Sequence, residues 1–563
     1  MPALPQIIEG IRQKKTQLQV GILCVLVAVS RYVFRSSYLY EWDSVQYALS
    51  IQKFDIMWHQ PHPPGYIFYV VLIKLSHVLV GDPNLSMILV NILVSVVSLL
   101  IFYQFNELFF KSQRLALACS LMFAVNPIFW FCGSTSVIYV LEALISIVIG
   151  YTMLVALKSS SFKPLAIAIF FLGFLGGFRQ TSTFLFIPLA IYVASRKIRS
   201  VNHAWKLLLV FSVSIFLWWL PTIMNTGGQK NYSLISEGLT AFGDQKMATF
   251  FGGYASYLLN NLANFAVWLL QGLTPVGVGI MLYAVFKYWK KYFVRKTIHN
   301  ERGIFMILWT APAAVLYLLY IEKAGYLLTI IPALLVFLTW SISRITTSGV
   351  DEIKPIRQAN GMFFSMIVLM ILWFVLPFTK QGIPQKLGVA AFIQQPPLSD
   401  YNWDVSAREL RQKDFVLSQT QNILLEQGLR EENTAIFYAG GYPTWRHLHY
   451  YLPGFSNYWL VDPTVSGIPQ FHAEYYLARN FSVSSYSGLP FWVIGERPDE
   501  IDILLADEID YLVWIADRDT TIYNQVQVNY PSIVTHTLSN GQEVLITRMQ
   551  ADPVDLGSFV LKH

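Results

Sequence analysis

The sequence predicts an α-helical polytopic membrane protein that carries a soluble α/β domain after its membrane part. Of its 563 residues, 54% are hydrophobic, 15% are aromatic and only 13% are charged, which is typical of chains that cross a bilayer many times. Apolar runs of about 20 residues, enough to span a hydrocarbon core of about 30 Å, recur over residues 18–377. Beyond residue 377, short apolar runs alternate with charged segments. We therefore expect a transmembrane domain at 1–377 and an extracytoplasmic α/β domain at 378–563.

The apolar runs predict about eleven transmembrane helices. Their expected positions are 18–35, 85–106, 115–131, 137–157, 164–178, 181–195, 205–221, 257–286, 303–320, 326–343 and 361–377. The segment 64–80 is also apolar, but it is short and contains Lys74 and His77. We expect it to lie in the outer interface as an amphipathic helix, where lysine reaches the headgroups. The first exterior loop, 36–84, is then long and follows the membrane surface.

Basic residues predict the orientation of the chain. They cluster in alternate connections, at 12–15, 111–114, 158–163, 196–206, 287–302 and 344–357. By the positive-inside rule these connections are cytoplasmic, which makes the N-terminus cytoplasmic and the C-terminal domain extracytoplasmic in a plasma (inner) membrane. The overall net charge of +6 therefore reflects topology, and we expect no nucleic-acid partner. Arg31 and Arg35 follow the first apolar run without a small-residue cleavage pattern, so we interpret that run as an uncleaved anchor.

The cysteines exclude two kinds of site. Cys24, Cys119 and Cys132 all lie in or at the ends of apolar segments. This arrangement fits neither a disulfide framework nor a CxxC metal site, and it leaves the redox compartment undetermined.

The first exterior loop is the strongest candidate for a functional site. The stretch "EWDSVQYALSIQKFDIMWHQPHPPGYIFY" (41–69) contains several ionisable residues and prolines: Glu41, Asp43, Asp55, His59, His62, Pro61, Pro63 and Pro64. Loops of this length are usually functional or disordered, and the aromatic residues and prolines argue against disorder. The alternative is a plain connecting loop that Trp42 and Trp58 anchor in the interface.

Three motifs, in order along the chain, carry a resemblance to a known family. The first is "WDSVQY" (42–47) with "HQPHPPGY" (59–66), the second is "NPIFWFCGSTSVIYVLEAL" (126–144), and the third is "IEKAGYLLTIIPAL" (321–334). Together they resemble exterior loops of the C-type membrane glycosyltransferases, a group that includes protein O-mannosyltransferases and the aminoarabinose transferases of lipid A. The resemblance covers the whole membrane region, and many members also carry a soluble exterior domain at the C-terminus.

The resemblance implies the C-type glycosyltransferase fold and an inverting sugar transfer by single displacement. The donor is a sugar on a polyprenyl phosphate, and the acceptor is a lipid, glycan or protein group at the outer membrane face. Residue by residue, it implies that Asp43 is the catalytic base, that Glu142 holds the second acidic position, and that Lys323 and Tyr326 face the donor phosphate. Two positions depart from the family pattern. Ser44 stands where many members have a second carboxylate, and Glu142 stands where many have aspartate.

Elementary chemistry supports the same roles. An acceptor hydroxyl loses its proton as it attacks an anomeric carbon, and a carboxylate such as Asp43 can take that proton. The leaving phosphate gains negative charge, which fixed cations such as Lys323 and Arg179 stabilise. Each residue also has a structural interpretation. In these interpretations Glu142 caps a helix or bonds Tyr139, Lys323 reaches the interface beside Glu322, and Arg179 is an interfacial arginine. Because ionisable groups at membrane depth are costly and usually functional, we favour a catalytic or acceptor-binding role for Glu142. We count Tyr139 among the substrate-binding candidates.

His59 and His62 leave two interpretations open. Their spacing of three residues allows a zinc or other divalent cation site. Without a cysteine or a clustered carboxylate, we favour hydrogen bonding to substrate or a role in holding the loop. The sequence therefore predicts no certain cofactor, with a divalent cation as the alternative.

The C-terminal domain alternates helix and strand signals. We expect a helix at 418–429, buried strands at 434–441 and 509–517, and a hairpin at 533–548 that turns at Asn540-Gly541. The segment "YPTWRHLHYYLPG" (442–454) follows the first strand, where ligand crevices open in such sheets. Packing of this segment against the membrane part is the alternative.

We expect an enzyme rather than a transporter. A flippase or other transporter of lipid-linked glycans is also basic inside and rich in aromatic residues, but it places ionisable groups near the bilayer midplane, often within internal repeats. Here these groups gather at the exterior ends and no repeat is visible. A polymerase or ligase of lipid-linked glycans is the closer alternative.

Overall fold

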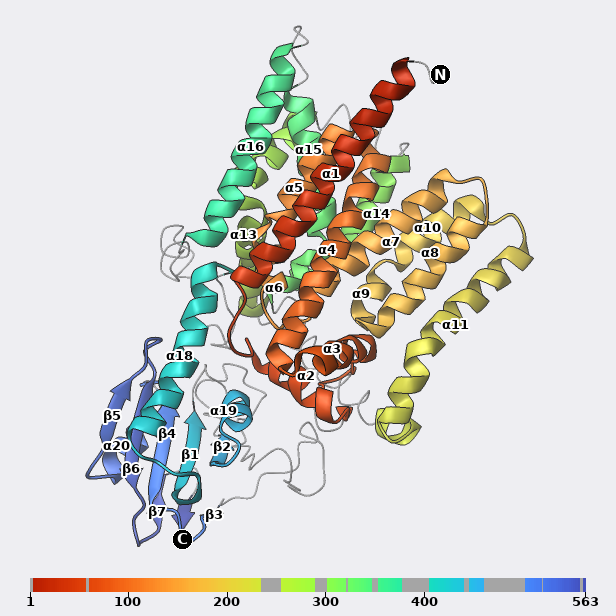
Figure 1. Ribbon diagram of the computed structural model, residues 1–563. Helices are drawn as coiled ribbons and strands as arrows, with labels where there is room; N and C mark the ends of the chain where they lie inside the picture. The colour runs from red at the N-terminus through yellow and green to blue at the C-terminus, as the bar shows by residue number, and fades with distance from the viewer. Residues whose placement is uncertain are drawn as a thin grey trace.

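The computed structural model describes residues 4–56, 60–233, 255–288, 301–319, 323–346, 353–376, 405–439, 445–459, 502–518, 520–556 and 560–562. Long helices make up most of the molecule, and a smaller α/β domain lies at one end of them (Figure 1). The expected architecture, a helical polytopic protein with a C-terminal α/β domain, is confirmed. The expected boundary between 377 and 378 lies outside the described residues.

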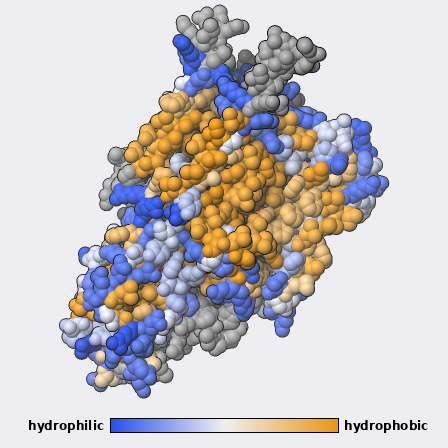
Figure 2. Space-filling model, viewed as in Figure 1, coloured by the Kyte–Doolittle hydropathy of each residue, from blue (hydrophilic) through white to orange (hydrophobic). Residues whose placement is uncertain are grey.

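Seven of the described helices are long and apolar enough to cross a membrane. They include or coincide with α1 (Leu4–Val33), α4 (Pro83–Phe110), α7 (Val140–Lys158), α11 (Val201–Asn225), α13 (Ala255–Tyr288), α14 (Glu301–Leu319) and α16 (Ile353–Val375). Large apolar side chains on α1 and α11 are exposed, among them Leu26 and Trp205. Figure 2 shows the resulting apolar surface over the long helices, with hydrophilic surface at their ends and on the C-terminal domain. This surface suits a bilayer.

The helices differ from the expected eleven spans because polar residues and prolines interrupt several apolar runs. The run 115–131 forms α5 (Gln113–Ala124) and α6 (Pro127–Gly133), which are bent by 58° and count as an eighth span if taken together. Asn126 begins α6, since its side chain accepts a hydrogen bond from the Phe129 amide at 3.1 Å. The run 181–195 forms two short helices, α9 (Gln180–Leu185) and α10 (Ile187–Lys197).

Three further apolar helices are shorter than a full span. They are α3 (Ile67–Val80), α8 (Lys163–Phe174), which continues into the 3₁₀ turn η2 (Leu175–Gly177), and α15 (Ile331–Thr346). The helix expected at 326–343 begins later, at Ile331, because the 3₁₀ helix η4 (Ala324–Thr329) occupies its first turn.

Several connections between the long helices lie at the end away from the C-terminal domain. The start of α1 and the connections α4–α5 and α7–α8 lie at one end of the helices in Figure 1, and the C-terminal domain lies at the other. Contacts tie the basic end together: Arg114 donates to the Asn360 side chain at 2.6 Å, and Tyr288 donates to the Arg344 carbonyl at 3.0 Å.

Helices α2 (Trp42–Gln52) and α3 lie across the lower ends of the long helices (Figure 1). Gly81, at φ 77°, ends α3, a backbone conformation that glycine adopts without strain. Asp82 then caps α4 by accepting a hydrogen bond from the Leu85 amide at 2.6 Å. The polar first loop is thus held at the end of the helices that faces the C-terminal domain.

The C-terminal domain is built on a five-stranded sheet in the order β2-β1-β4-β6-β5. The strands are β1 (Thr434–Ala439), β2 (Ser456–Trp459), β4 (Tyr511–Ala516), β5 (Val534–Thr537) and β6 (Glu543–Arg548); β1 is parallel to β2 and β4, and β6 is antiparallel to its neighbours. A smaller sheet pairs β8 (Val560–Lys562) with β3 (Asp502–Leu504) and β7 (Val554–Asp555). The expected hairpin is present, and Gly541 in its turn has a φ of 93°.

Helices cover both faces of the five-stranded sheet. Val416 and Ile423 of α18 (Ala407–Glu426) share a core with β1, β4 and β6, and Val526 of α20 (Thr521–Asn529) packs in the core of the opposite face. Helix α18 begins earlier than the expected 418, because Ser406 caps it through the Glu409 amide at 3.4 Å. The 3₁₀ turn η6 (Glu431–Asn433) precedes β1, and α19 (Trp445–Tyr451) lies between β1 and β2.

Candidate active site

The start of α2 carries two carboxylates. Glu41 is the N-cap residue and Asp43 lies in the first turn, where the partial positive charge of a helix N-terminus favours a negative side chain. The Glu41 backbone N–H donates to the Ser44 hydroxyl at 3.4 Å, and Ser44 is fully buried. Ser44, the first departure from the family pattern, therefore belongs to the cap of this helix.

Lys323 joins both carboxylates. Its Nζ donates to Oε2 of Glu41 at 2.8 Å and to Oδ2 of Asp43 at 2.9 Å. Lys323 is the N-cap of η4, so this contact joins the loop at 36–84 to the segment before α15. Three largely buried charged groups thus meet at one point, and Lys323 is paired with two carboxylates.

Two further side chains contact Asp43. The hydroxyl of Tyr139 donates to Oδ2 of Asp43 at 3.2 Å, and Nδ1 of His62 lies 3.7 Å from Oδ1. Tyr139 comes from the loop before α7, and His62 from the proline-rich segment before α3. Both oxygens of Asp43 therefore have polar neighbours from other parts of the membrane domain.

A second buried cluster surrounds Glu142. Its carboxylate pairs with the guanidinium of Arg179 and accepts a hydrogen bond from Thr329 at 3.0 Å. The hydroxyls of Thr329 and Tyr317 lie 2.9 Å apart. Because a buried carboxylate is costly without partners, this cluster compensates the burial of Glu142, whose side chain is 1% exposed.

Aromatic rings connect the two clusters. The guanidinium of Arg179 lies 4.8 Å from the ring centre of Tyr326 and 5.2 Å from that of Tyr139, distances at which cations and aromatic faces attract each other. The two rings lie 5.5 Å apart. Their approach requires Gly325, because a Cβ there would come within 2.4 Å of Tyr139.

The electrostatics of the first cluster favour an ionised carboxylate and a charged lysine. Burial alone would raise the pKa of Asp43, but Lys323, His62 and Tyr139 together hold it well below its usual range. Burial alone would lower the pKa of Lys323, but Asp43 and Glu41 hold it well above its usual value. Burial lowers the pKa of His62 to about 4 despite the attraction of Asp43, so His62 is neutral near pH 7.

The two expected histidines have different outcomes. His59 lies outside the described residues, whereas His62 lies beside Asp43. Among the residues that the structure describes, no group of three or more His, Cys, Asp and Glu side chains could hold a metal ion.

Sequence reasoning did not assign a site role to Glu41, Thr329 or Tyr317. A signal existed for Glu41, which lies two residues before Asp43 in the polar loop at 36–84. Thr329 follows Tyr326 by three residues, and Tyr317 lies in an apolar run; their contacts with Glu142 and with each other follow only from the packing of η4, α7 and α14.

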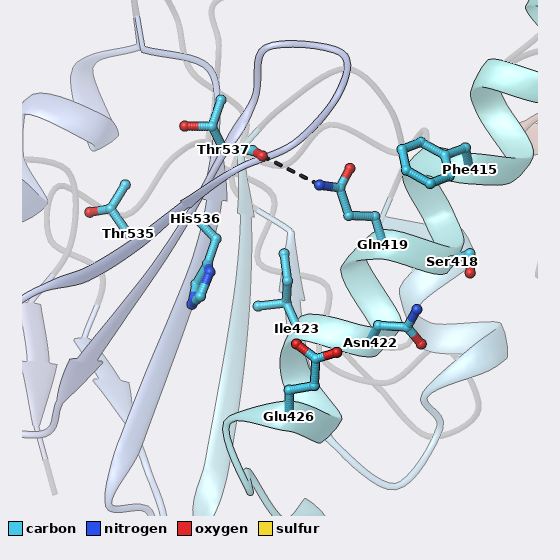
Figure 3. A pocket seen from close by; sticks show the side chains of 9 residues that line it. All are labelled: Phe415, Ser418, Gln419, Asn422, Ile423, Glu426, Thr535, His536 and Thr537. Carbon is cyan, nitrogen blue, oxygen red and sulfur yellow. Dashed lines mark hydrogen bonds between the residues drawn. The ribbon is translucent and has the colours of Figure 1, made fainter.

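A separate pocket lies in the C-terminal domain between α18 and β5 (Figure 3). It has a volume of about 470 Å³, and its lining includes Phe415, Asn422 and Glu426 of α18 and His536 of β5. Gln419, also in its wall, donates to the Thr537 carbonyl at 3.4 Å and accepts from the Ser539 amide at 3.0 Å. This glutamine therefore covers the edge of the sheet, and the pocket is distinct from the residues around Asp43.

Residues 61–221 match the family model described as dolichyl-phosphate-mannose-protein mannosyltransferase. The matched segment holds His62, Tyr139, Glu142 and Arg179, whereas Asp43 and Lys323 lie outside it. The resemblance to membrane C-type glycosyltransferases is confirmed over these residues. Together with the long apolar helices, it supports a multi-pass membrane glycosyltransferase as the class of this protein.

No curated protein matches the chain. A cryo-EM structure of the arabinofuranosyltransferase AftD from Mycobacteria is similar with a TM-score of 0.37 and 12% sequence identity. The similarity covers 95% of this chain and 40% of that chain, so this chain spans well under half the length of that protein.

Proposed function

We propose that this protein transfers a sugar from a polyprenyl-phosphate donor to an acceptor at the outer face of the plasma (inner) membrane. The observation that carries the proposal is the contact of Asp43, a carboxylate on α2, with Lys323, a cation. Helix α2 lies at the end of the long helices that bears the C-terminal domain (Figure 1). The matched family is named after mannose carried on dolichyl phosphate. A sugar on a lipid phosphate is the donor class proposed here. The acceptor is a hydroxyl-bearing or phosphate-bearing lipid, glycan or protein.

In the proposed reaction Asp43 is the general base. The acceptor oxygen attacks the anomeric carbon, its proton passes to the Asp43 carboxylate, and the bond from the anomeric carbon to the phosphate oxygen breaks. The lipid phosphate leaves with the electron pair of that bond. Because the acceptor and the phosphate occupy opposite sides of the carbon in a single displacement, the sugar is transferred with inversion.

Lys323 is the proposed partner of the leaving phosphate. An ammonium group has three N–H donors, and two of them bind Glu41 and Asp43. The third can bind a phosphate oxygen and stabilise the charge that develops there. Arg179, which stacks on Tyr139 and Tyr326, supplies a second cation close to the same rings.

These cations supply positive charge without a metal ion, so a divalent cation is proposed only as an accessory. Activity should survive treatment of the purified protein with EDTA. Loss of activity that Mg²⁺ or Mn²⁺ restores would assign a required cation to this site.

The decisive test is incubation of the purified protein with a panel of polyprenyl-phosphate sugars and candidate acceptors. We expect release of free polyprenyl phosphate with one donor, together with a glycosylated product of inverted anomeric configuration. If no donor releases its phosphate while labelled lipid-linked sugar crosses a vesicle bilayer that contains the protein, the transporter alternative replaces this proposal. Release of a lipid diphosphate from a lipid-linked glycan would instead favour the polymerase or ligase.

A further inference from the structure

The C-terminal domain contacts the chain segment that leads into α2. Asp414 of α18 accepts hydrogen bonds from the backbone amides of Ser37 at 2.8 Å and Tyr38 at 3.2 Å. These contacts join positions more than 370 residues apart in the sequence. The side chain of Asp414 is only 12% exposed, whereas Ser37 is exposed.

Residues of helix α19 form hydrogen bonds with the next backbone groups of the same segment. The Leu39 amide donates to the hydroxyl of Tyr451 at 2.9 Å, and Nε2 of His447 lies 3.0 Å from the Leu39 carbonyl oxygen. His447 is fully buried, and burial lowers its pKa to about 3. The neutral ring therefore donates its Nε2–H to the carbonyl.

The membrane domain holds the other side of this segment. The Ser36 amide donates to the Ser134 carbonyl at 3.0 Å, and the Tyr40 amide donates to the Ser136 hydroxyl at 3.2 Å. The segment is therefore fixed between the two domains, and Glu41 and Asp43 follow directly after it.

A cation from the C-terminal domain also reaches the first residue of α2. The guanidinium of Arg446 lies 4.5 Å from the ring centre of Trp42, and Arg446 is 1% exposed. Because Trp42 precedes Asp43, this contact fixes the helix turn that carries the proposed base. Helices α18 and α19 of the C-terminal domain thus hold the chain from residue 37 to residue 42.

We propose that the C-terminal domain positions the proposed base: Asp414, Tyr451 and His447 hold the backbone of residues 37–39 so that Asp43 stays in place against Lys323 and Tyr139. This inference rests on the proposed function. Asp414, Tyr451 and His447 are positioning residues, because they hydrogen-bond the backbone that leads to Asp43. A shift of about 1 Å in a reacting group is enough to cost about a hundredfold in rate.

The test compares three variants of the full-length protein. Asp414→Ala removes both acceptors for Ser37 and Tyr38, Tyr451→Phe removes only the hydroxyl that accepts from Leu39, and Glu426→Gln is a control on an exposed part of the same helix. We expect Asp414→Ala to lower kcat about ten- to hundredfold and Tyr451→Phe to lower it less. Donor KM should change less than threefold, since Lys323 and Arg179 remain, and the control should match wild type.

A second readout does not depend on activity. Amide hydrogen exchange in α2 should become faster in Asp414→Ala and in Tyr451→Phe, and stay at the wild-type rate in Glu426→Gln. Wild-type kcat and wild-type exchange in both test variants would overturn the inference and leave the proposed function standing. An equal loss of donor binding and kcat would also overturn it. If the wild-type protein releases phosphate from no donor, the proposed function fails, and the positioning role fails with it.

Discussion

Nζ of Lys323 lies 2.9 Å from Oδ2 of Asp43, across 280 positions of sequence. The pair joins the loop at 36–84 to the segment before α15, and the same Nζ lies 2.8 Å from Glu41. An ammonium shared by two carboxylates holds the proposed base ionised while keeping one N–H for a ligand. The pair is therefore the natural place to begin testing the site.

Replacing Asp43 by asparagine should abolish transfer but leave the fold and donor binding nearly intact. The amide keeps the shape of the side chain and its contact with Tyr139, but it cannot take a proton from the acceptor. Loss of a general base lowers the rate about 10²–10⁴-fold, measured as release of polyprenyl phosphate. Asp55→Asn is the control, since Asp55 lies in the same loop and pairs with Lys53. Wild-type turnover in Asp43→Asn would show that Asp43 is not the general base.

Replacing Lys323 by alanine should weaken use of the donor. A hydrogen bond to a charged group contributes about 1.5–3 kcal/mol, which corresponds to a loss of roughly ten- to hundredfold in kcat/KM for the donor. Lys323→Arg should restore part of the loss, because it keeps the positive charge. The measurement is donor-concentration dependence for the three proteins, with Lys74→Ala in α3 as the control. If the alanine variant has wild-type donor affinity and turnover, the phosphate must be sought at Arg179.

The pH profile of kcat/KM tests the electrostatics of Asp43. Lys323, His62 and Tyr139 hold the pKa of Asp43 well below its usual range against the effect of burial. A lowered pKa keeps the carboxylate ionised until the pH falls below that range, so Asp43 should produce no acid limb between about pH 5 and pH 8. In Lys323→Ala the burial remains while the main opposing charge is lost, so an acid limb should move upward in pH. A wild-type acid limb in this window, unmoved in Lys323→Ala, would contradict the assignment.

Much of the architecture is predictable from the sequence, because span length and basic connections are local features of the chain. The breaks are harder to predict. Asn126 and Pro127 divide one apolar run, and Lys323 and η4 shorten another. The contacts of Asp414 with Ser37 and Tyr38 could not be predicted at all, since backbone amides carry no signal in the sequence. The contact of Glu41 with Lys323 depends on where α2 begins, because Glu41 is the N-cap residue of this helix.

The orientation of the chain is a prediction that labelling of introduced cysteines can test. Arg196→Cys places a thiol at the basic end of α10, and Glu426→Cys places one on α18 of the C-terminal domain. In intact cells an impermeant thiol reagent should label the second variant and not the first, because basic connections stay cytoplasmic. Cys119 and Cys132 are buried and Cys24 is partly buried, so a background with Cys24→Ser is suitable. Labelling of Arg196→Cys alone would invert the topology and put Asp43 at the cytoplasmic face.

Substitutions of the buried pair Glu142 and Arg179 should distinguish a role in stability from a role in catalysis. Removing one partner leaves an uncompensated buried charge, which costs about 3–5 kcal/mol, so Glu142→Gln and Arg179→Gln should each lower the unfolding temperature clearly. The double variant should lose less stability than the sum of the losses in the two single variants, since neither charge is then left unpaired.

The double variant Glu142→Gln/Arg179→Gln should nevertheless transfer sugar slowly, because Arg179 no longer stabilises the leaving phosphate. Arg518→Gln is the matched control, since it breaks an ion pair with Glu543 in the C-terminal domain and should leave the rate unchanged. The measurement is thermal unfolding together with kcat for all four variants. Wild-type turnover in the double variant would show that Glu142 and Arg179 hold the fold and take no part in transfer.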